Sequence, residues 1–191
     1  MKKHIPLPSI RTLQRKLHQI EFRPRILEDT FNLLADEIKC NAEEWKDCVL
    51  ALDEMSIEPR EMFDPSTNEV SGRTTLASHS GIANKVLVFI LGGIVHQWKQ
   101  TVCFHLTGFK VKDAKEGITG QTYADIIKDI KQRGERIGLR IHCVVSDMGS
   151  DNRSMWKAFG PVFIVETYFQ DRLKYGLKMP SRFIVMNQVN A

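Results

Sequence analysis

Two aspartates at the ends of apolar runs are the residues of this chain best suited to chemistry. Residues 49–52 (VLAL) lead into Asp53, and residues 141–146 (IHCVVS) lead into Asp147. Short apolar runs bounded by polar turns are typical of buried strands. The carboxyl end of such a strand lies at the rim of an open sheet, where ligands and metals usually bind. If the two strands are parallel neighbours, the carboxylates converge, and such a pair suits divalent-metal chemistry on phosphodiesters.

Magnesium prefers oxygen ligands and keeps several waters, so two or three carboxylates are enough to hold it. Glu54 follows Asp53 directly, but successive side chains of a strand point to opposite faces, so we do not expect Glu54 to be a primary ligand. A structural explanation stays open for both aspartates. Without any role in metal binding, an Asp can end a strand because the rim of the sheet is exposed to solvent, or because its side chain caps the next helix.

The first third of the chain is predicted to be helical. Ser9 is a plausible N-cap for an amphipathic helix over residues 10–20, and a second helix is expected over residues 27–39. Asn41 and Glu44 form a capping-box pattern that predicts a third, brief helix.

From Cys48 onward the pattern predicts mainly strands. We expect a strand ending near Met55, a turn at residues 64–68, and strands over residues 86–95 and 98–106, with Gly92-Gly93 marking a bulge or a close backbone approach. A helix over residues 119–137, closed by Gly138, precedes the strand 139–146, and Ser150 or Asp151 then caps a last helix.

This order predicts an α/β fold with a ribonuclease H-like mixed sheet flanked by helices. The expected elements are a strand, a meander, a crossover helix and a last strand that returns beside the first. The connection through the helix is expected to be right-handed, which is the default for such crossovers. The expected division is a basic helical segment (1–47), a partial ribonuclease H-like core (48–160) and a divergent tail (161–191).

Charge is unevenly distributed over the 191 residues, whose net charge is +4. Residues 1–25 hold seven Lys or Arg against one acid, Glu21. This basic arm indicates either a polyanionic partner or a solvated helix face. Four scattered cysteines without metal-ligand spacing indicate buried thiols in a reducing compartment. Neither a signal peptide nor a membrane span is expected.

Three segments together resemble the P-element family of DNA transposases, which includes vertebrate relatives with a THAP zinc finger. They are residues 52–57 (LDEMSI), 63–72 (FDPSTNEVSG) and 146–156 (SDMGSDNRSMW), and residues 6–13 (PLPSIRTL) resemble the segment before the family's catalytic core. The resemblance spans residues 5–160. It implies a ribonuclease H-like fold with the first two catalytic acids, which are also metal ligands, at Asp53 and Asp147.

The same resemblance implies the cofactor and the partners. The family cuts and joins DNA with Mg²⁺, and GTP is a further cofactor, but the insertion that binds GTP has no counterpart in this sequence. DNA is the expected partner, together with a second copy or a full-length transposase, and a nuclear location follows from the family alone. No membrane partner is expected.

Departures from the family pattern leave the activity open. No THAP zinc finger precedes residue 5, the resemblance fades after Gly160, and the family's third acid, a late glutamate, has no matching position. Glu166 could serve only if residues 161–165 form a strand and Glu166 opens the next helix. We therefore expect impaired cleavage and strand transfer. The alternatives are a non-catalytic remnant that binds DNA or a transposase, and a fragment without a selected role.

Overall fold

A mixed β-sheet forms the centre of the computed structural model, which describes residues 8–17, 23–64, 68–111, 118–147, 149–159, 165–166 and 184–185. Its strands lie in the order β5-β4-β1-β6-β8-β7. Their bounds are β1 (Asp47–Ser56), β4 (His79–Gly93), β5 (Lys99–Lys110), β6 (Arg140–Ser146), β7 (Val165–Glu166) and β8 (Ile184–Val185). β1 is antiparallel to β4 and parallel to β6, which confirms the predicted α/β class and the return of a late strand beside the first.

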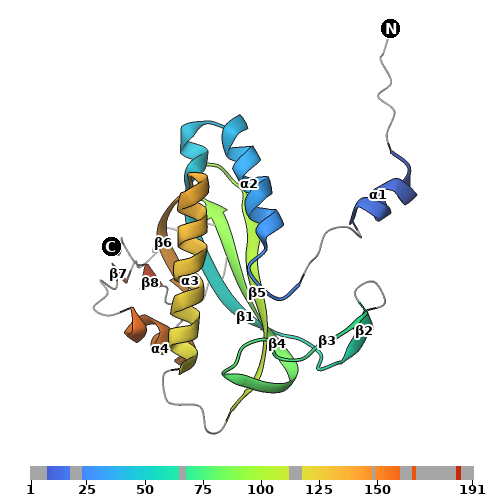
Figure 1. Cartoon of the computed structure of the whole chain (residues 1–191). Helices are drawn as coiled ribbons and strands as arrows, with labels where there is room; N and C mark the ends of the chain where they lie inside the picture. The colour runs from blue at the N-terminus through green and yellow to red at the C-terminus, as the bar shows by residue number, and fades with distance from the viewer. Residues whose placement is uncertain are drawn as a thin grey trace, which may run out of the picture.

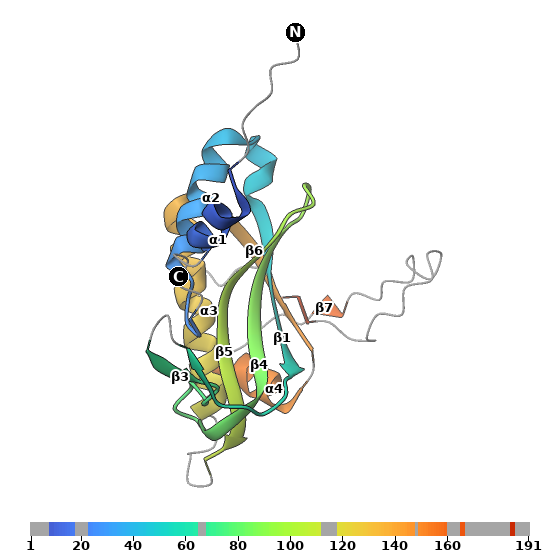
Figure 2. The same cartoon turned by 90° about the vertical axis from the view of Figure 1, so that its right-hand side faces the viewer.

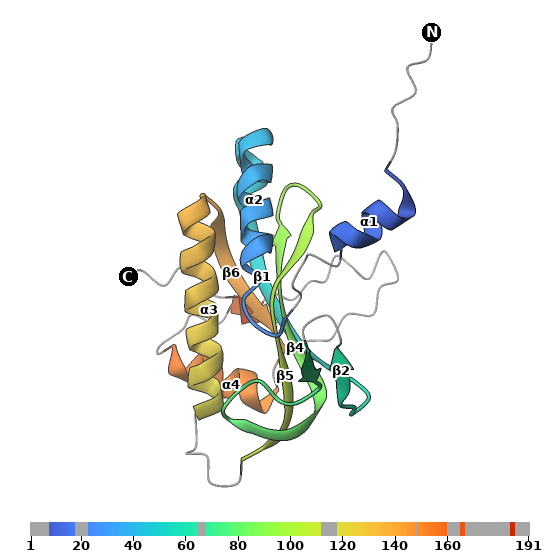
Figure 3. The same cartoon turned by 45° about the vertical axis from the view of Figure 1, so that its right-hand side comes forward.

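Three helices pack on one side of this sheet, as Figures 1 and 3 show: α2 (Glu28–Cys40), α3 (Ile118–Ile137) and α4 (Ser150–Ala158). Alternate residues of β1 explain which face they cover, because Cys48, Leu50 and Leu52 are buried while Asp53 is exposed. Figure 2 shows the strands β5, β4 and β1 in front of α4. The period of two along β1 therefore separates a helix-covered face from an open face.

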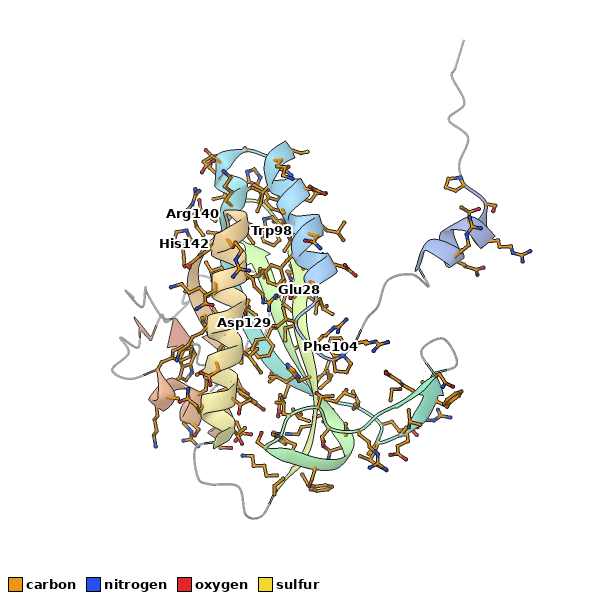
Figure 4. The ribbon with its side chains drawn as sticks, viewed as in Figure 1. Glu28, Trp98, Phe104, Asp129, Arg140 and His142 are labelled. Carbon is orange, nitrogen blue, oxygen red and sulfur yellow. The ribbon has the colours of Figure 1, made fainter. Side chains whose placement is uncertain are left out.

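The helices contribute apolar stripes at helical spacing to the same core. Phe31, Leu34 and Ile38 of α2 belong to the buried cluster, as do Tyr123 and Ile127 of α3. Arg133 of α3 joins the two helices, because its guanidinium pairs with Glu28 of α2 as well as with Asp129, at 2.8 Å between Nε and Oδ1. Glu28 and Asp129 lie between α2 and α3 in Figure 4.

A small hairpin interrupts the connection between β1 and β4. It consists of β2 (Met62–Asp64) and β3 (Glu69–Ser71), which form a separate two-stranded sheet on either side of the predicted turn. Gly72 fixes its base, because φ there is +108° and a Cβ would lie 1.9 Å from the backbone oxygen of Arg60. Residues 65–67 of the turn lie outside the described part of the chain.

The amino ends of β1 and β6 are joined by an ionic network. Arg140 donates from Nε to Asp47 Oδ1 (2.7 Å) and from Nη1 to Glu43 Oε1 (2.5 Å), and His142 Nε2 lies 2.6 Å from Asp47 Oδ1. Hydrogen bonds from Arg140 and contact with His142 hold the pKa of the Asp47 carboxyl well below its usual range. Figure 4 shows Arg140 and His142 together at this end of the sheet.

Two of the predicted helix caps are wrong. Asn41 does not cap the brief 3₁₀-helix η1 (Glu43–Lys46), because its side-chain amide donates back to the carbonyl of Glu37 at 2.7 Å and so closes α2. The N-cap of α4 is Gly149, so Ser150 and Asp151 lie inside the helix.

Two other local predictions hold. Ser9 does cap α1 (Ile10–Leu17), with Oγ accepting from the N–H of Thr12 at 3.2 Å, while residues 18–22 lie outside the described part. The close backbone approach occurs at Gly93, where a Cβ would lie 2.2 Å from the oxygen of His96.

Candidate functional site

Parallel pairing of β1 with β6 brings the two predicted aspartates to one rim. Leu50 pairs with Val144 and Ala51 with Val145, which is the last pair of the ladder and lies two residues before each aspartate. Adjacent strands lie about 4.8 Å apart. Both residues are exposed. Asp147 directly follows β6, whereas Asp53 lies within β1, three residues before its end at Ser56. Both aspartates are thus in the carboxyl-terminal half of the sheet, the side at which open α/β sheets bind ligands.

Asp53 lies on the open face of β1, and its carboxylate faces solvent. The only partner of this side chain among the described residues is the N–H of Glu54, which donates to Oδ1 at 2.8 Å. Opposite Asp53 on the antiparallel side lies Val88 of β4, an apolar neighbour without a competing charge. The remaining lone pairs of the carboxylate are available to a cation.

Glu54 points to the other face, as the strand period predicts, and is held there by three donors. Its Oε1 accepts from Tyr123 Oη and from Thr107 Oγ1, each at 3.1 Å, and its Oε2 accepts from Lys85 Nζ at 3.1 Å. Tyr123 and Thr107 are each 1% exposed. Burial, reinforced by the charge of Glu54, raises the pKa of Tyr123, so the phenol stays a donor. We call Glu54, Lys85, Thr107 and Tyr123 the Glu54 clamp.

Asp147 is more closely constrained than Asp53. Its Oδ1 accepts from the N–H of Gly149 at 3.0 Å and from Asn152 Nδ2 at 2.5 Å. Among the described residues no donor reaches Oδ2. Asn152 was not predicted as a functional residue, although a polar side chain in the first turn of the helix after Asp147 is a signal that could have found it.

A third protein ligand does not join the pair within the part of the chain that the structure describes. No group of three or more His, Cys, Asp or Glu side chains there could hold a metal ion. Glu166 lies in the strand β7 instead of opening a helix, and β8 separates that strand from β6. The residue proposed as a substitute third acid is therefore not on a strand adjacent to either aspartate.

The expectation of buried thiols holds for Cys48 and Cys103, but it is wrong for Cys40, which is exposed at the end of α2, and Cys143 is half-buried. Burial raises the pKa of Cys48 and of Cys103 to about 12, so both thiols stay protonated at neutral pH. Burial also lowers the pKa of His105, whose Nδ1 lies 3.2 Å from Thr75 Oγ1, while His96 is exposed on the β4–β5 turn.

The donor set of the two aspartates suits a hard divalent cation. Both contribute carboxylate oxygens, and their exposure leaves room for the waters that Mg²⁺ retains. A site for a soft metal would need thiolate or imidazole ligands, which this rim does not supply. The residues present thus fit magnesium, with two protein ligands in the described part of the chain.

The described part of the basic arm includes the helix α1. Arg11 and Arg15 are both exposed, and so is Ile10 at 75%. The side chain of Lys16 lies outside the described residues. In Figure 1 α1 stands apart from the helices that cover the sheet, so its charges are presented to solvent. None of the described helices is both long and apolar enough to cross a membrane.

Comparisons with known proteins agree with this architecture. The family model described as TNP-like, RNase H N-terminal domain matches residues 22–160. The Transposable element P transposase of Drosophila melanogaster is 27% identical over 159 residues, which are 83% of this chain and 18% of that protein. The chain thus spans less than a fifth of the length of that relative.

A solved structure, the Drosophila P element transposase strand transfer complex, matches with a TM-score of 0.60 and 26% identity. The match covers 84% of this chain and 31% of that one. The family model, the sequence relative and the solved structure all indicate the same kind of protein. The chain therefore belongs to the TNP-like RNase H N-terminal domain family and is a P-element-type, transposase-like protein.

Proposed function

We propose that this chain provides the first half of a transposase catalytic site, in which Asp53 and Asp147 hold Mg²⁺ for cleavage and strand transfer of DNA. The observation that supports the proposal is the parallel pairing of β1 with β6, whose register reaches Ala51 and Val145, two residues before each aspartate. The similarity to P-element transposases supports DNA as the substrate.

The residues of this chain would act by binding and orienting. Asp53 offers a carboxylate on the open sheet face, and Asp147 offers Oδ2 while Oδ1 is held by two N–H donors. Divalent cations held by these two carboxylates would supply activation of the attacking oxygen and stabilisation of the leaving oxygen. Because the described part of the chain holds no group of three or more possible metal ligands, we expect the chain alone to cleave DNA poorly.

Binding of Mn²⁺, a paramagnetic substitute for Mg²⁺, tests the site directly. We expect electron paramagnetic resonance to detect bound Mn²⁺ in the wild-type protein and to lose that signal in Asp53→Asn and in Asp147→Asn. The exposed Glu44→Gln on the 3₁₀-helix η1 is the matched control, because it removes one carboxylate away from the rim. Equal Mn²⁺ binding in all four proteins would contradict the proposal.

Cleavage assays test the expected impairment. Supercoiled plasmid incubated with the purified chain and Mg²⁺ should show little nicking. Robust nicking that disappears in Asp53→Asn would instead show that two acids are enough, or that the chain supplies a third from outside the described residues.

A non-catalytic DNA-binding role is the second candidate, favoured by the exposed Arg11 and Arg15 on α1. Such contacts to phosphates release counterions, so the affinity for duplex DNA should fall steeply as salt rises. Replacing both arginines by Gln should reduce the slope of log K against log [salt] by about 2. Fluorescence anisotropy measures the slope, and a salt-independent or undetectable interaction would remove this candidate.

A further inference from the structure

Asn152 is a buried amide in direct contact with one of the two rim carboxylates. It lies in the first turn of α4 and is 8% exposed. Its Nδ2 donates to Asp147 Oδ1 at 2.5 Å, and the N–H of Gly149 donates to the same oxygen at 3.0 Å. Both donors thus converge on one oxygen, and the second oxygen accepts none within the described residues.

This arrangement differs from ordinary capping of a helix. A capping side chain accepts from the unpaired backbone N–H groups of the first turn. Asp147 accepts instead from the side chain of Asn152 and from the N–H of Gly149, which is itself the N-cap residue and makes no side-chain cap. Stabilising the helix end therefore does not account for the Asn152 contact.

The amide donor is held in place by the packing of α4. Trp156 Nε1 donates to Ser146 Oγ at 3.2 Å, which ties the helix to the last residue of β6. Met155 is fully buried, and Asp151 pairs with Lys110 of β5. On the other side, a Cβ on Gly120 of α3 would lie 2.5 Å from the backbone carbon of Ser154, so the two helices meet at close range.

A rigid donor on Oδ1 has a defined effect on the carboxylate. An exposed aspartate otherwise samples several rotamers, and a bound cation must overcome the entropy of fixing one of them. Two hydrogen bonds to Oδ1 select one orientation and leave the lone pairs of Oδ2 for a cation. Partners that orient metal-binding side chains in this way are known to affect metal affinity by about 10–100-fold when they are removed.

We propose that Asn152 is a positioning residue that orients Asp147 so that Oδ2 faces the cation. The proposal rests on the function proposed above, in which Asp147 holds a divalent cation. It concerns a residue that acts through Asp147 and does not itself touch the metal.

The test measures Mn²⁺ affinity of the full chain in Asn152→Leu, which keeps the side-chain size and removes the donor. We expect the affinity to fall about tenfold or more. Gln121→Met is the first control, because it removes another amide-to-aspartate hydrogen bond, from Gln121 Nε2 to Asp125 Oδ1 at 2.8 Å on α3. Val102→Ala is the second, because it lowers stability at a fully buried site on β5.

The outcomes separate this inference from the proposed function. Unchanged Mn²⁺ affinity in Asn152→Leu, with binding lost in Asp147→Asn, overturns the role of Asn152 and leaves the metal site standing. An equal loss in Val102→Ala also overturns it, because general destabilisation would then explain the effect. A wild-type protein that binds no Mn²⁺, or binds it unchanged in Asp147→Asn, contradicts both proposals.

Discussion

Asp53 and Glu54 are neighbours in the sequence, yet the sheet gives their carboxylates opposite surroundings. Asp53 meets solvent on the open face, whereas Glu54 accepts three hydrogen bonds on the helix-covered face. The clamp joins β1 to β4, β5 and α3 through one side chain. Removing the Glu54 carboxylate partly from solvent costs free energy, and the three hydrogen bonds offset this cost only while every donor is in place.

Removal of one clamp donor should therefore destabilise the fold. Tyr123→Phe keeps the ring and deletes the hydroxyl that donates to Glu54 at 3.1 Å. We expect a loss of about 1–3 kcal/mol in the free energy of unfolding, since the bond joins a buried hydroxyl to a half-buried, charged acceptor. Urea denaturation measures it, and Gln121→Met two positions earlier, on the exposed side of α3, should change stability little.

At the scale of elements, the close contact between α3 and α4 determines how the Asp147 turn is held. A Cβ on Gly120 would lie 2.5 Å from the backbone carbon of Ser154 and 2.7 Å from the N of Met155. Because α4 begins directly after this turn, any displacement of the helix moves Asn152 relative to Asp147.

Two glycines of α3 allow a matched test of that contact. Gly120→Ala forces the new methyl group against backbone, so we expect a loss of about 1–3 kcal/mol or more. In Gly134→Ala the methyl group meets the flexible end of Ile141 at 2.9 Å, and better helix propensity by about 1 kcal/mol offsets the contact. Thermal unfolding of both variants checks the difference, and equal melting temperatures would contradict the proposed role of Gly120.

Hydrophobic periodicity was sufficient to predict the central elements. The expected helix over residues 119–137 is α3, and the expected strand over residues 139–146 is β6, each within one residue of its observed ends. Their apolar spacing reflects burial against one face, and burial is the property that periodicity records. The parallel pairing of β1 with β6 could be anticipated from the order of the elements and the default right-handed crossover.

Contacts between distant polar side chains could not be predicted in this way. Arg140 and Asp47 are 93 residues apart, and Tyr123 and Glu54 are 69 residues apart. Sequence spacing carries no information about such pairs until the sheet order is known. The prediction that Asn41 caps the following helix was wrong for a related reason. Asn41 could cap either the helix before it or the helix after it, and only the backbone geometry decides between them.

Across the whole molecule, stability should depend on pH through the buried His79 and the half-buried His105. Burial lowers the pKa of both His79 and His105 below the ordinary value of about 6.5. Below that value the unfolded chain takes up protons that the folded chain does not bind, so stability should fall as pH decreases.

Urea denaturation at pH 7.5 and pH 5.5 measures this dependence. We expect a lower free energy of unfolding at pH 5.5 in the wild type and a smaller difference in the double variant His79→Gln/His105→Gln. The same pH difference in both proteins would show that other groups cause the effect.

The parallel pairing of β1 with β6 also bears on how the protein is made. During translation β1 is synthesised before β6, which follows only after β4, β5 and the whole of α3. Pairing of strands so far apart in the sequence is slow, because the entropy cost of closing the loop precedes the free energy gained from the contacts. The nascent chain thus leaves one edge of β1 unpaired until residues 140–146 have been synthesised.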